Sequence, residues 1–377
     1  MSKNLYTRLS QKTLSIEVFC TIASSILLST NFVRKSMLFF FLRIYGKEFG
    51  MGHVVARPLH PQFVASQHTG LIVTVVTGIC EMQCQWCITK QQRRNRIQQK
   101  QIPIDVITQG IKDLAPYTEL FSIQGDELGQ RQTFTDAYEM LECAAKHDIR
   151  TSCVTSGFNF DEIAGSLGEL GTSVMLSMDG TLSLHVATRR RYTANDTRHT
   201  HGQTITALEH GLEAFIQEAS RDLICVNTLL RLETKRALFH LPEFLYMLGI
   251  RHWAGTPQVI AATQTSPTRF KHDPQEIFDL ALTLDARARE IGMLGLMFMD
   301  ELGGIGKELT PPELNVFTLA RPDLLIRIDD MTHQVAIGAD EVSAMNVAPW
   351  DYRSESLAEH IVRRLGSNLP VPYANAA

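Results

Sequence analysis

The sequence lacks several features that would assign the protein to common classes. None of its apolar runs reaches the roughly 20 residues that a membrane-spanning helix needs, and it contains no internal repeat or low-complexity segment. Its 36 Lys and Arg residues are balanced by 40 Asp and Glu residues, which gives a net charge of −4. This balance gives no reason to expect a nucleic-acid partner. With 44% hydrophobic and 20% charged residues, the 377-residue chain has the composition of an ordinary globular protein.

Cysteine is absent from the last part of the chain. There are seven cysteines, an odd number, and none follows Cys225. Cys20, Cys143, Cys153 and Cys225 are widely scattered along the sequence. This distribution argues against a disulfide framework and indicates a reducing, cytoplasmic compartment.

The remaining cysteines, Cys80, Cys84 and Cys87, are four and then three positions apart and follow the apolar, β-branched run 71–76. A strand that ends in a glycine turn brings the three sulfurs to one point at its carboxyl end. Three thiolates suit an iron–sulfur cluster or zinc. A closed structural site needs four protein ligands, whereas three leave one metal position open for a substrate or cofactor. The alternatives are a Cys3His zinc knuckle and three buried structural thiols.

From residue 70 onward, strand patterns alternate with helical patterns. We expect strands near residues 71–77, 119–124, 149–155, 172–178, 222–230 and 251–260, with a last strand over 293–299. We expect helices over residues 103–115, 133–147, 160–168, 203–219, 236–248 and 274–291. This alternation predicts an α/β fold in which right-handed crossovers connect the strands of a parallel sheet.

Less regular segments flank this alternating region. Residues 303–320 are rich in Gly and Pro and are predicted to be a linker. Residues 324–338 are predicted to form a β-hairpin that turns at residues 329–332, and a short helix is expected over 355–365.

Two apolar helical patterns lie near the N-terminus, within residues 12–44, where basic residues outnumber acidic ones. One interpretation is a helical hairpin that lies on an anionic membrane surface as a peripheral contact. The other is that these helices cap the domain or form an oligomer contact. The second is favoured because apolar helical faces usually belong to a core.

The C-x3-C-x2-C motif, with Trp86 directly before its third cysteine, resembles that of the radical S-adenosylmethionine (SAM) superfamily. The resemblance implies that Cys80, Cys84 and Cys87 hold three irons of a [4Fe–4S] cluster, and that SAM binds the fourth. It also implies reductive cleavage of SAM to a 5'-deoxyadenosyl radical, which abstracts hydrogen from the substrate. The protein would supply placement and the exclusion of side reactions.

The resemblance also implies an overall organisation. We expect a partial (β/α)6 TIM-type barrel with an N-terminal helical extension and a small C-terminal β-hairpin and helix extension. The expected boundaries are 1–69 for the N-terminal extension and connector, 70–300 for the core barrel, and 301–377 for the C-terminal extension. That last part is faintly similar to SPASM or twitch extensions but has no cysteine for an auxiliary cluster.

Two strand ends resemble SAM-binding elements of the family. Gly125 and Glu127 resemble a Gly-Gly-Glu element that binds the SAM amino group, with Asp126 in place of the second glycine. Ser177 begins a Ser-x-Asp-Gly element, in which the serine reaches the ribose or carboxylate of SAM. Ordinary turns are the alternative for both elements.

Three further residues are site candidates. Arg191, chosen over Arg190, corresponds by region to an arginine that pairs with the SAM carboxylate, and a solvated basic face is the alternative. Asn227 is expected to contact SAM or substrate from a strand that resembles a Val-Asn-Thr strand of the family. Cys225 shares its face and is a candidate hydrogen donor, although buried cysteines are more often small hydrophobes.

These observations predict a radical SAM enzyme in a biosynthetic or peptide-modifying role, with a small-molecule or peptide substrate. The family resemblance implies an electron donor of the flavodoxin or ferredoxin type. The expected location is cytoplasmic, with membrane association if the N-terminal helices bind a membrane. The alternative is a zinc- or cluster-stabilised barrel without catalysis that serves in binding or redox sensing.

Overall fold

The structure is a computed structural model of the chain. It describes residues 70–77, 84, 86–87, 100–124, 131–157, 160–181, 184–185, 201–260, 269–299, 315–317, 325–338 and 346–366. The predicted N-terminal helices, including the membrane-contact segment 12–44, lie outside these residues.

One large sheet organises the described part of the chain, in the order β10-β9-β6-β5-β4-β3-β2-β1-β11-β12-β13. All neighbouring strands from β10 to β11 are parallel, and β12 and β13 are antiparallel to their neighbours. Its strands are β1 (Leu71–Val76), β2 (Thr118–Gln124), β3 (Arg150–Thr155), β4 (Ser173–Ser177), β5 (Ile224–Leu230), β6 (His252–Pro257), β9 (Leu296–Met299), β10 (Asn315–Phe317), β11 (Leu325–Asp329), β12 (Gln334–Gly338) and β13 (Asn346–Pro349). A separate two-stranded ribbon consists of β7 (Val259–Ile260) and β8 (Arg269–Phe270).

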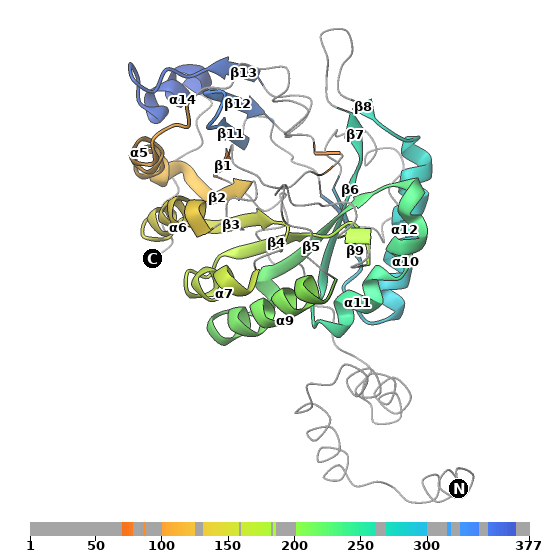
Figure 1. Cartoon of the computed structure of the whole chain (residues 1–377). Coiled ribbons are helices and arrows are strands. Elements are labelled where there is room, and N and C mark those ends of the chain that lie inside the picture. Colours follow the sequence, from red (N-terminus) through yellow and green to blue (C-terminus); the bar gives the residue numbers. More distant parts are fainter. Residues whose placement is uncertain are drawn as a thin grey trace, which may run out of the picture. The chain divides into compact units, whose positions relative to one another are not determined.

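Helices connect the consecutive parallel strands from β1 to β6 and from β6 to β9, and they lie along the outer side of the sheet (Figure 1). They are α5 (Ile104–Leu114), α6 (Arg131–Ala145), α7 (Phe160–Glu169), α9 (His201–Glu218), α10 (Lys235–Phe239), α11 (Leu241–Met247) and α12 (Pro274–Glu290), and α14 (Leu357–Leu365) follows the last strand. Among the described residues the outermost strands β10 and β13 do not pair with each other, so the barrel is partial, as predicted. None of the described helices is both long and apolar enough to span a bilayer.

The strands are buried mainly on the face that packs against the helices, so β3 alternates between partly buried and buried residues. All six residues of β1 are buried. The outward-facing side chains join the helices in one large core, in which Phe160 of α7 stacks on Phe215 of α9 with ring centroids 6.4 Å apart. The inward-facing side chains form separate, smaller clusters. The fold therefore has a packed outer layer and a distinct inner face, on which the candidate site lies.

Three predictions along the chain were wrong in detail. The expected helix over 236–248 is two helices, α10 and α11, because Pro242 has no N–H to donate to a continuous helix. The expected strand over 251–260 ends as β6 at Pro257, which removes a donor from the ladder. The predicted linker over 303–320 contains β10, which pairs with β9.

The predicted hairpin near residues 324–338 is confirmed, and it joins the main sheet. β11 pairs with β12 in the antiparallel sense and with β1 in the parallel sense. Asp329 fixes the turn, because its Oδ1 accepts hydrogen bonds from the amides of Met331 at 3.2 Å and Thr332 at 3.0 Å. The predicted domain boundaries stay a prediction.

The C-terminal helix α14 begins with a capping box. The hydroxyl of Ser356 accepts a hydrogen bond from the amide of Glu359 at 3.2 Å, and the Glu359 carboxylate accepts one from the amide of Ser356 at 2.8 Å. The helix packs on α5, where a Cβ on Gly110 would lie only 2.7 Å from the side chain of Leu357. Helix α14 therefore covers part of the outer layer beside β1.

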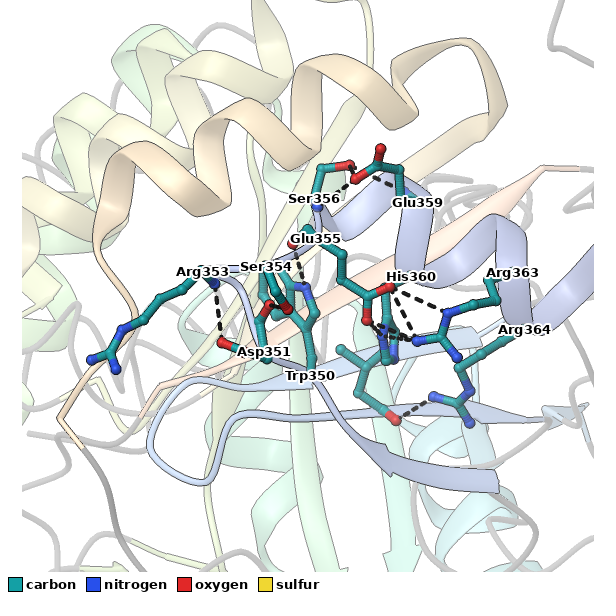
Figure 2. A network of polar contacts seen from close by, with 11 residues as sticks. Trp350, Asp351, Arg353, Ser354, Glu355, Ser356, Glu359, His360, Arg363 and Arg364 are labelled. Carbon is teal, nitrogen blue, oxygen red and sulfur yellow. Dashed lines mark hydrogen bonds and ion pairs between the residues drawn. The ribbon is translucent and has the colours of Figure 1, made fainter.

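A polar network joins α14 to the segment that precedes it (Figure 2). Glu355 accepts a hydrogen bond from Arg363 at 2.8 Å and lies 2.6 Å from Nδ1 of His360. The Trp350 indole donates to the backbone carbonyl of Glu355 at 3.2 Å. His360 is fully buried, and this burial lowers its pKa despite the neighbouring carboxylate.

We predict that close packing between α7 and α9 makes Gly211 sensitive to substitution. A Cβ at this position would lie 2.5 Å from the Phe160 ring and 2.7 Å from its carbonyl carbon. Gly211→Ala is expected to lower the free energy of unfolding by about 1–3 kcal/mol through overpacking. Gly165→Ala, in α7 with no atom within 4 Å, is the matched control and is expected to raise it by about 0.5–1 kcal/mol. Urea titrations measure both, and equal shifts would contradict the prediction.

We predict that burial of His360 makes the protein less stable in mild acid. The folded protein binds this proton less readily than the unfolded chain, in which the His360 pKa is near 6.5. The free energy of unfolding should therefore fall as the pH drops below about 6.5. His360→Asn cannot titrate and should show a shallower loss in urea titrations over the same pH range. Identical pH slopes for the two proteins would refute the assignment.

Candidate functional site

The cysteine loop begins where β1 ends, at the rim formed by the carboxyl ends of the parallel strands. Thr77 anchors its start, because its amide donates to the carbonyl of Gln124 at 3.0 Å and its hydroxyl donates to the same oxygen at 3.3 Å. Farther along, the amide of Cys87 donates to the carbonyl of Cys84 at 3.4 Å. The two cysteines therefore lie on one tight turn, and each is partly exposed.

These two cysteines differ from the other described cysteines in ways that matter for metal binding. Cys143, Cys153 and Cys225 are buried, and burial raises the pKa of each thiol. A thiol must lose its proton to bind a metal, so only Cys84 and Cys87 fit that role among the cysteines in the described ranges. Within those ranges, no three His, Cys, Asp or Glu side chains lie close enough together to hold a metal ion.

The lower inner face beneath the rim is apolar. Met175, Cys225, Ala254 and Met297, from four neighbouring strands, form a separate cluster. The Cys225 thiol is fully buried there, and burial raises its pKa to about 12. The structure thus places Cys225 on the inner face with Asn227, within an apolar layer.

The next layer toward the rim is polar. Ser177 and Asn227 are direct partners in the pairing of β4 with β5, so these two predicted site residues lie side by side. The Thr256 hydroxyl donates to Oδ1 of Asn227 at 2.9 Å. Sequence reasoning missed Thr256, although inward alternation along β6 would have placed it on the same face.

At the rim, Arg231 reaches the cysteine loop. Its guanidinium carbon lies 3.6 Å from the ring centroid of Trp86, which is a close cation–π contact. Arg231 is 93% buried, since its exposed fraction is 7%. Burial lowers the pKa of Arg231, while the charges of Asp179 and Glu233 act in the opposite direction. The sequence analysis did not identify Arg231. The only indication in the sequence is that Arg231 lies four residues after Asn227, so strand alternation places both on the same face.

A second ionic group lies beside Arg231. Glu233 accepts a hydrogen bond from Lys271 at 2.8 Å and lies 3.1 Å from Nε2 of His272. The hydrogen bond from Lys271 is the main reason that the pKa of Glu233 is lowered to about 2. The amide of Lys271 also donates to the carbonyl of Gln258 at 2.9 Å, so this group ties the segments after β5, β6 and β8 together.

Four predicted site residues, Cys80, Gly125, Glu127 and Arg191, lie outside the described residues. Their roles stay predictions. Of the others, the structure brings Ser177 and Asn227 together below Arg231 and Trp86, while Cys84 and Cys87 flank that contact on the loop.

Comparison with known proteins identifies the central part of the chain. Residues 74–226 match the family model of the radical SAM superfamily. No curated protein sequence matches the chain.

Solved structures share the fold. Streptococcus suis SuiB bound to its precursor peptide SuiA has a TM-score of 0.54 and 12% identity, and the match covers 86% of this chain and 77% of SuiB. Streptococcus suis SuiB alone has a TM-score of 0.51 and 12% identity, with coverage of 87% and 77%. The strand order and the matched residues agree with the partial barrel of this superfamily, whose cofactors are a [4Fe–4S] cluster and SAM.

We predict that the cysteines react according to burial and proton affinity. In folded, cluster-free protein at neutral pH, iodoacetamide should modify Cys84 and Cys87, because they are partly exposed. Cys153 and Cys225 should stay unmodified, because both are fully buried with raised pKa values. Peptide mapping by mass spectrometry measures the extents. Modification of Cys225 at the rate of Cys84 would show that the lower layer is open.

Proposed function

Since the chain carries a radical SAM domain over residues 74–226, we propose that the protein uses this domain to abstract hydrogen from a peptide substrate. One observation carries the proposal: Cys84, Trp86 and Cys87 lie at the carboxyl rim of a parallel barrel. In barrel enzymes this rim is where the reacting groups gather.

The cysteines have the first role in this proposal. Cys80, Cys84 and Cys87 would bind the [4Fe–4S] cluster, and the absence of a fourth ligand in the motif leaves one iron for SAM. When bound, the cluster and SAM supply the reductive cleavage of SAM and the abstraction of hydrogen. A flavodoxin- or ferredoxin-type donor would supply the electron.

The barrel residues bind and orient the cofactor and substrate. Gly125 and Glu127 would hold the SAM amino group, and Arg191 the SAM carboxylate. Ser177 and Asn227 are paired on the inner face, where their polar groups suit the ribose of SAM or the substrate. The apolar layer around Cys225 excludes water from the base of the site, which limits side reactions of a reactive intermediate.

Two considerations support a peptide as the substrate. SuiB shares the fold and was solved with its precursor peptide SuiA. The inner face also presents neutral polar groups, Ser177, Asn227 and Thr256, of the kind that hydrogen-bond to amides. A small organic molecule is the alternative substrate, and a non-catalytic zinc-stabilised barrel is the alternative function.

The test is anaerobic reconstitution with iron and sulfide, followed by reduction in the presence of SAM. We expect a brown protein with about four irons per chain and release of 5'-deoxyadenosine. Cys84→Ala and Cys87→Ala should each abolish that release and lower the iron content. Cys143→Ala is the matched control, because this buried thiol donates to the carbonyl of Thr108 on α5, away from the rim; it should retain both properties.

Two results would contradict the proposal. A colourless protein that contains zinc and ignores SAM would favour the binding module. Undiminished release of 5'-deoxyadenosine by Cys84→Ala would remove that cysteine from the ligand set.

A further inference from the structure

Solvent reaches the inner face of the central strands. In β3, the inward-facing residues Arg150, Ser152 and Val154 are partly exposed, whereas the residues between them are buried on the helix side. Gln124 of β2 and Met175 of β4 are strand partners of Val154 and are also partly exposed. The inner face therefore borders a space that a ligand can enter, and the side chains that line this space determine which ligand binds.

One level of this inner face carries only polar side chains across five neighbouring strands. In the strand pairing, Thr74 of β1 is the partner of both Arg327 of β11 and Ser122 of β2. Ser152 of β3 is in turn the partner of both Ser122 and Ser173 of β4. Neighbouring strands lie about 4.8 Å apart, so the side chains of paired residues are adjacent. We call Arg327, Thr74, Ser122, Ser152 and Ser173 the polar row.

The polar row faces inward, away from the helices. The residue that follows each member along its strand belongs to the outer core, so the members themselves point to the other side. These following residues are Ile328, Val75, Ile123, Cys153 and Val174. One level farther toward the amino ends of the strands, Leu325, Ile72 and Leu120 form a separate apolar cluster. The polar row therefore lies above an apolar base.

The polar row is buried, and one of its hydroxyls needs a partner. The exposed fraction is 7% for Arg327, 2% for Thr74, and 0% for Ser173. Among the described residues, Oγ of Ser173 has no hydrogen-bond partner. A buried hydroxyl without a partner is unfavourable and rare in native proteins. Ser173 therefore indicates a ligand that supplies the missing hydrogen bond.

The charges around the polar row favour a carboxylate as part of this ligand. Arg327 is the one charged member of the row, and its guanidinium can only donate hydrogen bonds. Asp329, the next inward residue of β11, directs its Oδ1 to two amides of its own turn. Arg150, two residues before Ser152, is ion-paired with Glu119. A guanidinium beside a line of hydroxyl donors complements a carboxylate, which accepts hydrogen bonds on both oxygens.

We propose that the polar row binds a carboxylate of the peptide substrate. The carboxylate accepts hydrogen bonds from the guanidinium of Arg327 and from the adjacent hydroxyl of Thr74. The substrate chain then follows the row, and its amides bond to the hydroxyls of Ser122, Ser152 and Ser173. The row covers four inter-strand steps, at most about 19 Å, which suits a chain of about five residues. This inference rests on the proposed function and adds the chemical group that the barrel recognises.

Two groups of a peptide supply this chemistry, an acidic side chain and the C-terminus, so the probes are two pairs of capped tripeptides. One pair is N-acetyl-alanyl-glutamyl-alanine N-methylamide and its glutamine twin. The other is N-acetyl-trialanine as the free acid and as the N-methylamide. Each is titrated calorimetrically into the reconstituted protein with SAM present. In one pair the carboxylate peptide should bind about tenfold more tightly than its neutral twin, and that pair identifies the source of the carboxylate.

Variants of the polar row test the assignment to residues. Arg327→Gln should abolish the preference, so that the twins bind alike. Ser173→Ala should weaken both twins by the same factor, about threefold, because it removes a neutral hydrogen bond. Since the Ser173 hydroxyl has no partner among the described residues, Ser173→Ala should not lower the free energy of unfolding without ligand. Urea titrations check this, and binding of the twins as tight as in the unmodified protein would remove Ser173 from the site.

Matched controls separate recognition from general damage. Arg364 of α14 donates to the carbonyl of Val335 at 2.6 Å, so Arg364→Gln removes a guanidinium from the helix side of the sheet. Thr151→Val removes a hydroxyl from the outer side of β3, where it lies 2.9 Å from the hydroxyl of Thr172. Both controls should keep the carboxylate preference of the unmodified protein.

The outcomes are distinguishable. If the unmodified protein cleaves SAM but neither carboxylate peptide binds more tightly than its neutral twin, the polar-row site is overturned and the proposed function stands; absence of binding by all four peptides counts in the same way. A preference that persists in Arg327→Gln, or that Arg364→Gln loses equally, also overturns the site. If the unmodified protein fails to form a cluster or to release 5'-deoxyadenosine, the proposed function itself fails. The comparison of twins on the unmodified protein does not depend on whether any variant folds.

Discussion

Parallel pairing is the constraint on which the rest of the structure depends. Because the strands from β10 to β11 in the sheet all run in the same direction, their carboxyl ends meet at one rim. Residues far apart in sequence, such as Trp86 after β1 and Arg231 after β5, therefore come into contact there. The helices pack against the outer faces of the strands. The inner faces do not contact these helices, and their polarity varies along the strands.

The inner face changes character along the strands. The cluster around Cys225 is apolar, the pair Ser177 and Asn227 lies nearer the rim, and the buried ions Arg231 and Asp179 lie at the rim itself. Strand alternation brings Cys225, Asn227 and Arg231 to one face, because every second residue of a strand points inward. A reactive intermediate generated at the rim would have oriented polar groups beside it and a dry floor beneath it.

Much of the fold was predictable because its signals are local. The apolar run of β1 and the turn residues Asp329 and Thr332 determine their elements through short-range physics, and those elements were predicted correctly. Pro242 and Pro257 are equally local signals, because proline interrupts a helix or ends a strand. The hydrophobic patterns around them continued past these prolines, so the predicted helix and the predicted strand were too long. The short strand β10 depends on pairing with β9, and its three residues carry no pattern of their own.

The candidate site likewise contains residues that could be predicted from the sequence and residues that could not. Cys84, Cys87, Ser177 and Asn227 could be named from motifs and alternation. Alternation also places Thr256 and Arg231 on the inner face, but what distinguishes these two residues is a hydrogen bond and a cation–π contact, which no motif marks. Both contacts join segments that are far apart in the sequence, so the sequence around either residue gives no sign of its partner.

The parallel pairing of β1 with β11 also constrains the order of assembly. During synthesis β1 can pair early with β2, but its other neighbour emerges only after the whole series from β2 to β10 has been made. Contacts between such distant segments form slowly, because a long loop must close first. The strand that precedes the cysteine loop therefore gains its second neighbour late, so a nascent chain would present an open sheet edge beside this loop.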